Sequence, residues 1–209
     1  MALPSVVHGY VLPSHYVIKK AQALLDKSRG LQVGFLGRAW TAEKRQSINV
    51  GERWLFGPKT QVDVTDSHGR TATWNMNRTS SGELSLLPPP AVLFAISGLF
   101  GGASLSQHLA GLGILASPRR LQLLDGEVAI SMGAETDQLN LPQAWFDQET
   151  FQPVRLIFRS DKSLYDLRMT DWSSPRTRGL FPRRLEIRRD GRPLRELSVS
   201  TLRHPKGPR

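Results

Sequence analysis

One stretch of the sequence, residues 84–118, contains no Asp, Glu, Lys or Arg, although these residues make up 22% of the chain. Within it, residues 91–100 read AVLFAISGLF and are apolar on every side. A helix on a protein surface keeps one polar face, so this segment has to be covered on most sides or lie over an apolar surface. Prolines and glycines divide the stretch into runs shorter than the ~20 residues that span a bilayer. The fold must therefore enclose an apolar helix.

Three helices are predicted. The first starts near Ser14, a candidate N-cap, has apolar residues at helical spacing and ends at Arg29-Gly30. The second follows residues 88–90, a triple proline that can open a helix, and stops at two glycines. The third is short and begins with Ser104 as its cap.

Alternating apolar and polar residues predict strands on both sides of the charge-free stretch. In LQVGFLGRAW, Leu31, Val33 and Phe35 share one face, and Val50, Trp54 and Phe56 do so further on. After Pro118 the strand patterns resume and continue to the C-terminal region. These features predict a mainly β, antiparallel fold with a few helices. We expect one domain over residues 1–209, with its core at about 14–203, because a chain of this length can bury one core.

The net charge of +10 is concentrated at one end. Residues 174–209 hold eleven Lys or Arg against three Asp or Glu, which is +8 of the total. Such a region suggests an anionic partner, either nucleic acid, acidic headgroups or an acidic protein. No Phe, Tyr or Trp lies among residues 183–209, which argues against single-stranded nucleic acid. The residues expected on a basic docking face are Arg183, Arg184, Arg188 and Arg192.

The arginine-rich segment 180–203 is interpreted as an edge hairpin whose arginines face water. Placing Ile187 opposite Leu197 keeps the apolar residues on one face. A two-residue Asp-Gly turn would instead pair Ile187 with Leu194. The sequence therefore predicts a longer loop over about residues 190–194.

Enzyme motifs are missing from the sequence. The chain has no cysteine, and its five histidines show no metal-ligand spacing. Asp161, Asp166 and Asp171 recur around one strand in the manner of turn and edge residues, not of an acid/base pair. There is no nucleophile elbow or phosphate loop. We therefore expect a protein that is not an enzyme and has neither metal nor cofactor.

Several local patterns resemble the LolA/LolB lipoprotein-carrier superfamily. They are GERWLFGP at residues 51–58, PPPAVLFAISGLFGG at 88–102, AWFDQETFQPVRLIF at 144–158 and LFPRRLEIRRDG at 180–191. The resemblance is patchy but extends over about residues 14–202. It implies a half-open antiparallel β-barrel with an N-terminal helix and two short lid helices.

The resemblance also implies a function. It implies a monomeric periplasmic carrier of lipoprotein acyl chains or phospholipid, for transport to or insertion in the outer membrane. Partners would be an inner-membrane releasing complex or an outer-membrane acceptor, with peripheral membrane contact or a tether to the outer membrane. Such a location implies a signal sequence, which residues 1–10 do not contain. The residues expected to line or plug the apolar cavity are Trp40, Trp54, Phe56, Trp74, Leu93, Phe94, Phe100, Phe158 and Met169.

Two points leave alternatives open. Gly57 stands where LolA-type carriers have an arginine thought to hold the lid closed, so that latch cannot be carried over. RseB-type lipid or peptide sensors resemble the same half-barrel, and fold alone does not separate carrier from sensor. Those sensors have a second domain, for which this chain is too short, and this favours the carrier. The apolar helix itself is either a core helix packed inside a curled sheet or a lid over a cavity that collapses when empty.

Overall fold

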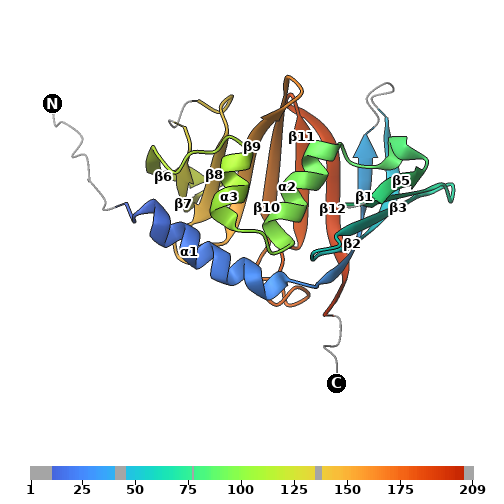
Figure 1. The fold of residues 1–209 in the computed structure, drawn as a ribbon, viewed down its shortest axis with the longest axis horizontal. Coiled ribbons are helices and arrows are strands. Elements are labelled where there is room, and N and C mark those ends of the chain that lie inside the picture. The colour runs from blue at the N-terminus through green and yellow to red at the C-terminus, as the bar shows by residue number, and fades with distance from the viewer. Residues whose placement is uncertain (1–10, 41–45, 77, 135–137, 205–209) are drawn as a thin grey trace.

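The computed structural model describes residues 11–40, 46–76, 78–134 and 138–204. It consists of one large antiparallel sheet with helices along one side (Figure 1). The helices are α1 (Ser14–Leu25), α2 (Pro90–Phe100) and α3 (Leu105–Gly111), with 3-10 turns η1 (Asp26–Ser28) and η2 (Leu84–Leu86). The three predicted helices are therefore confirmed.

Within the described residues, the sheet has twelve strands in the order β5-β4-β3-β2-β1-β12-β11-β10-β9-β8-β7-β6. β1 joins the two halves because it pairs with both β2 and β12, and all eleven pairs of neighbouring strands are antiparallel. The edge strands β5 and β6 are not hydrogen-bonded to each other, so the sheet curls without closing. The predicted half-open barrel is thus confirmed. The strands are β1 (Gln32–Trp40), β2 (Ser47–Leu55), β3 (Gln61–Asp66), β4 (Thr71–Asn75), β5 (Arg78–Gly82), β6 (Arg119–Leu124), β7 (Glu127–Met132), β8 (Gln143–Asp147), β9 (Pro153–Ser160), β10 (Ser163–Thr170), β11 (Arg184–Arg189) and β12 (Arg192–Arg203).

The three helices lie on the same side of the sheet (Figure 1). Along β3, burial alternates residue by residue, so that Val62 and Val64 point to the helices and the core while their neighbours are less buried. Along α1, Val17, Ala21 and Leu25 form the buried stripe. One hydrophobic core fills the space between sheet and helices.

The start of α1 differs from the prediction. Pro13 occupies the N-cap position, and Ser14 is the first helical residue. The hydroxyl of Ser14 donates instead to the carbonyl oxygen of Ala116, at 2.5 Å, which links α1 to the segment after α3. The residue expected to cap the helix thus connects two distant parts of the chain.

The C-terminal hairpin corrects two predictions. Its turn is the two-residue Asp190-Gly191, with φ of 51° and 77° at the two positions, as a type I′ turn requires. A register shift between Ile187 and Arg188 absorbs one residue of β12, so Ile187 pairs with Arg195. The expectation of a longer loop was wrong because it did not allow for this bulge. The hairpin is also not at an edge, since β12 pairs with β1 and β11 with β10.

Gly37 allows β1 and β12 to approach closely. A Cβ atom at this position would lie 2.0 Å from the backbone oxygen of Glu196. We expect Gly37→Ala to destabilise the protein by about 2–4 kcal/mol, because the backbone of the neighbouring strand would have to shift. Urea denaturation measures this, with Gly51→Ala as the control. A Cβ at Gly51 meets its nearest atom at 3.9 Å, so that change is expected to alter stability by less than about 1 kcal/mol. Equal stability of the two variants would contradict the prediction.

Candidate functional site

Six aromatic side chains meet in the interior at the junction of sheet and helices. Phe100, at the end of α2, lies 4.3 Å from the ring of Phe181 and 5.4 Å from that of Phe56, measured between ring centroids. Such spacings are typical of favourable aromatic pairs. We call this group the aromatic cluster; it consists of Phe35, Trp54, Phe56, Phe100, Trp172 and Phe181.

Helix α2 fills the concave side of the sheet. Of its eleven residues, eight are buried, among them Leu93, Ile96 and Phe100, and Phe94 is the large exposed exception. The sequence required that this apolar helix be covered, and the structure covers it with the curled sheet below and α3 beside it (Figure 1). The apolar concave wall of the sheet is thus already covered by the protein's own side chains.

The structure brings together only part of the predicted lipid-binding set. Trp74 is half-buried and packs on the core from β4, while Phe94 is 47% exposed. Trp40 lies outside the aromatic cluster, with the Arg38 guanidinium 5.3 Å from its ring centroid. Phe158 is stacked on Tyr165 at 5.3 Å, in a separate group. Buried in the core are Trp54, Phe56, Leu93, Phe100, Phe158 and Met169.

A buried ion pair lies against the aromatic cluster. Arg195 of β12 donates from Nη1 to the carboxylate of Glu52 on β2 at 2.6 Å, and the Trp54 indole donates to the same carboxylate at 2.8 Å. Both charged side chains are almost completely buried, at 4% and 0% relative exposure. Burying two charges is costly unless each finds its partner, so this geometry is tightly constrained.

The same arginine also contacts the segment that leads into α2. Its Nη2 donates to the carbonyl oxygen of Leu86, the last residue of η2, three residues before the proline pair that opens the helix. Its Nε has no hydrogen-bond partner among the residues that the structure describes. Thus a guanidinium does hold the entry to α2, but it comes from β12 and not from the position of Gly57.

Sequence reasoning missed both members of this pair, although a signal was present. Glu52 is in phase with Val50 and Trp54, and Arg195 is in phase with Leu197, so each interrupts an inward-facing apolar run. An acidic and a basic residue that each take an inward-facing position in a strand together predict a buried ion pair. The earlier interpretation placed all arginines of the hairpin in water, and for Arg195 this was wrong.

The two short helices contact each other through His108. Its buried imidazole donates from Nε2 to the carbonyl oxygen of Ala95 in α2, at 2.9 Å. Gly98 makes room for the ring, because a Cβ there would lie 2.1 Å from it. Burial lowers the pKa of His108, although the hydrogen bond to Ala95 acts in the opposite direction.

This lowered pKa predicts a pH dependence of stability. Since the unfolded chain binds the proton more tightly than the folded one, stability is complete above the ordinary pKa of about 6.5 and decreases as pH falls below it. We expect the urea midpoint to decrease between neutral and acidic pH, and His108→Gln to flatten this part of the profile. The same change at exposed His15 should leave the slope as in the wild type. A wild-type slope in His108→Gln would contradict the assignment.

The four arginines of the predicted basic face do not form one cationic patch. Arg183 lies 3.4 Å from the carboxylate of Asp171, and Arg188 lies 2.5 Å from that of Glu186. Arg184 is exposed on β11, and Arg192 is exposed beside the hairpin turn. Half of the predicted face is therefore neutralised locally.

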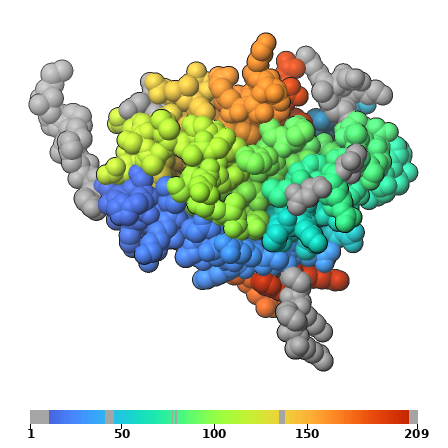
Figure 2. All heavy atoms as spheres, viewed as in Figure 1, coloured from blue at the N-terminus to red at the C-terminus, as the bar shows by residue number. Residues whose placement is uncertain are grey.

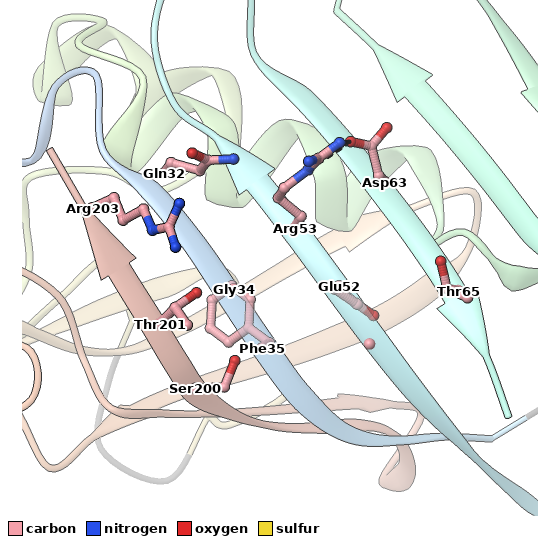
Figure 3. Close-up of a pocket in the computed structure, with 11 residues that line it drawn as sticks. Gln32, Gly34, Phe35, Glu52, Arg53, Asp63, Thr65, Ser200, Thr201 and Arg203 are labelled. Atoms are coloured by element: carbon pink, nitrogen blue, oxygen red, sulfur yellow. Dashed lines mark hydrogen bonds and ion pairs between the residues drawn. The ribbon is translucent and has the colours of Figure 1, made fainter. Parts of the chain in front are cut away.

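The pocket in Figure 3 lies on the side of the sheet that faces away from the helices. It has a volume of ≈ 530 Å³, and polar side chains of β1, β2, β3 and β12 surround it, including Gln32, Arg53 and Arg203. None of the nine predicted lipid-binding residues lines it. A smaller pocket of ≈ 270 Å³ lies between α2, the end of α3 and β9, and both Phe94 and Phe158 line it.

The described residues, 11–40, 46–76, 78–134 and 138–204, were searched for metal sites and for membrane-spanning helices. Within them, no group of three His, Cys, Asp or Glu is arranged to hold a metal ion. In the same part of the chain, no helix is long and apolar enough to cross a membrane.

The fold was compared with known proteins. No protein-family model matches the sequence, and no curated protein sequence matches it. A LolA superfamily protein from Nitrosomonas europaea superposes with a TM-score of 0.56 at 15% identity, over 95% of this chain and 96% of that chain. A putative outer membrane lipoprotein-sorting protein domain from Vibrio parahaemolyticus gives a TM-score of 0.51 at 11% identity, over 94% and 95% of the two chains. A DUF1329 family protein from Desulfovibrio piger gives 0.50 at 13% identity, over 95% and 96%.

These similarities extend over nearly the whole of each chain. At sequence identities of 15%, 11% and 13%, they establish a similar fold and nothing more. The twelve-stranded open sheet, with α2 and α3 on its concave side, agrees with the fold that the sequence motifs suggested. The chain therefore has the fold of the LolA superfamily.

Proposed function

We propose that this protein is a non-enzymatic carrier that binds acyl chains of lipoproteins or of phospholipids between its sheet and its two lid helices. The observation that supports this most is α2, an apolar helix that fills a concave apolar wall. A helix of this kind can exchange with an acyl chain, because both bury apolar surface against the same side chains. Each CH₂ transferred from water contributes about 0.8 kcal/mol to such binding.

The chain offers two points about which α2 could move. Pro89 and Pro90 precede the helix, and Gly101-Gly102 follows it, with Gly102 at a φ of 89°. The contact between Arg195 and Leu86 lies just outside the first of these points and would hold the entry segment while the helix turns. We also propose that residues 1–209 form one domain and that the protein acts as a monomer.

The proposed location is the periplasm, and transfer would be toward the outer membrane. The support comes from the Vibrio parahaemolyticus neighbour, which is described as an outer membrane lipoprotein-sorting domain. An inner-membrane releasing complex or an outer-membrane acceptor would be the protein partners. A regulator that senses lipid or peptide in the same interior is the competing function, and it would act on a signalling partner instead of delivering lipid.

Native mass spectrometry of the purified protein, followed by lipid extraction, tests the proposal. We expect a mass increment that corresponds to phospholipid or to a lipid-modified peptide, and its loss on delipidation. A protein that stays ligand-free and does not bind added lysophospholipid would refute acyl-chain binding. Peptide binding without acyl chains would favour the sensor.

A further inference from the structure

The surface of the lid carries no charge. Among residues 90–117, the exposed positions are Phe94 and Leu115, and otherwise only Pro, Ala, Gly, Ser and Gln. We call these exposed positions the lid surface. Leu115 is 65% exposed and Phe94 47%, so two large apolar side chains stand out from a background of small ones. In a chain with 22% charged residues, an uncharged surface of this extent points to contact with something other than water.

Helix α1 borders the lid surface and is basic. The two are tied by the bond from the Leu105 amide to the Gln22 side chain and by that from Ser14 to Ala116. Lys19 and Lys20 are exposed on α1, and Lys27 is exposed on η1, the 3-10 turn that follows it. Figure 2 shows α1, in blue, and the lid, in green and yellow-green, covering one continuous face.

Further cations lie at the margin of the same face. Arg29 donates to the carbonyl oxygen of Gly102 at 3.0 Å and also pairs with Asp26 at 2.8 Å. Arg159 lines the pocket that contains Phe94. Tyr16, 38% exposed on α1, lies under the ammonium group of Lys20 at 5.5 Å. Tyrosines and lysines of this kind are favoured where a protein meets lipid headgroups.

We propose that this helical face, α1 and η1 together with the lid surface, docks on an anionic lipid bilayer. In this arrangement Lys19, Lys20 and Lys27 lie near the headgroups, while Phe94 and Leu115 reach the boundary of the acyl region. An uncharged surface loses no ionic hydration on contact with lipid, and each lysine near an anionic surface contributes about 1 kcal/mol. An acidic protein partner would satisfy the lysines, but it would leave Phe94 and Leu115 without an apolar complement that the structure specifies.

This docking proposal rests on the proposed function, because the proposed movement of α2 determines the side on which lipid enters. If α2 moves away from the sheet, the cavity opens toward the side on which the lid lies, and an acyl chain passes between bilayer and protein without crossing water. The two claims fail separately, because lipid extraction of the purified protein needs no vesicle, and vesicle binding needs no lipid uptake.

Co-sedimentation of the full chain with phosphatidylcholine vesicles, with and without phosphatidylglycerol, tests the docking. We expect binding only when phosphatidylglycerol is present, and weaker binding as salt rises. The triple variant Lys19→Glu, Lys20→Glu and Lys27→Glu is expected to bind at least about 100-fold more weakly, from the loss of three contacts. The control variant Arg184→Glu, Arg192→Glu and Arg203→Glu changes the net charge by the same amount on other elements and should lose less than about 5-fold. Equal losses in both variants, or no binding by the wild type, would overturn the proposal.

The absence of cysteine allows a second, site-specific readout. A polarity-sensitive fluorophore is attached to Leu115→Cys on the lid surface or to Leu36→Cys on β1, two positions that are 65% and 63% exposed. On addition of anionic vesicles, a blue shift is expected at Leu115 and none at Leu36. A response at Leu36 alone, or at neither position in a protein that binds, would contradict docking through the helical face.

Discussion

Replacing Arg195 with alanine is expected to destabilise the protein by about 3–5 kcal/mol, one of the largest effects of any single change in this chain. The change leaves the carboxylate of Glu52 buried, with the Trp54 indole as its one remaining donor within the described part of the chain, and removes the contact to the Leu86 carbonyl oxygen. Chemical denaturation measures the effect. An exposed ion pair, Arg38 on β1 with Glu196 on β12, provides the control, because Arg38→Ala is expected to cost at most about 1 kcal/mol.

The double variant Glu52→Leu and Arg195→Met separates the cost of an unpaired charge from the value of the pair itself. It is expected to be more stable than either single variant, since no buried charge remains. Arg195→Ala with a stability within about 1 kcal/mol of the wild type would contradict the assignment of a buried, tightly paired site.

The second large effect is expected at Phe100. Its ring contacts Phe56, Trp172 and Phe181, so Phe100→Ala leaves a cavity in the aromatic cluster and should cost about 3–5 kcal/mol. Phe94→Ala, in the same helix but 47% exposed, is expected to cost less than about 1 kcal/mol. Thermal unfolding of the two variants compares them directly.

The Phe100→Ala variant also tests whether acyl chains bind in the interior behind α2. An apolar cavity in a protein interior binds apolar ligands, so added lysophospholipid should raise the melting temperature of Phe100→Ala more than that of the wild type. If both proteins respond equally, or neither does, the interior behind α2 is not where acyl chains bind.

Much of the fold followed from local pattern. Alternation along segments such as Leu31, Val33 and Phe35 predicted strands, and the proline before and the glycines after α2 predicted its limits, because these signals depend on near neighbours. The half-open barrel itself came from motif resemblance. Neither source predicted the pairing of β1 with β12, which joins segments far apart in the chain.

The wrong predictions for the C-terminal hairpin arose because one extra residue in β12 changed its register with β11. The bulge between Ile187 and Arg188 restores the apolar alternation after a tight turn and so determines where Arg195 lies. A single extra residue on one strand leaves no clear mark in composition or periodicity. Phe94 was expected to line or plug the apolar cavity, and its position on α2 leaves its side chain 47% exposed.

Movement of α2 away from the sheet when lipid binds is the central claim, and a distance measurement between spin labels tests it most directly. One label replaces Phe94 on α2 and the other exposed Ser198 on β12, in a chain without native cysteine. A reference pair, Thr71 on β4 and Ser198, reports on the sheet alone. We predict that lysophospholipid lengthens or broadens the first distance and leaves the second unchanged. An unchanged first distance in a protein shown to hold lipid would contradict the account.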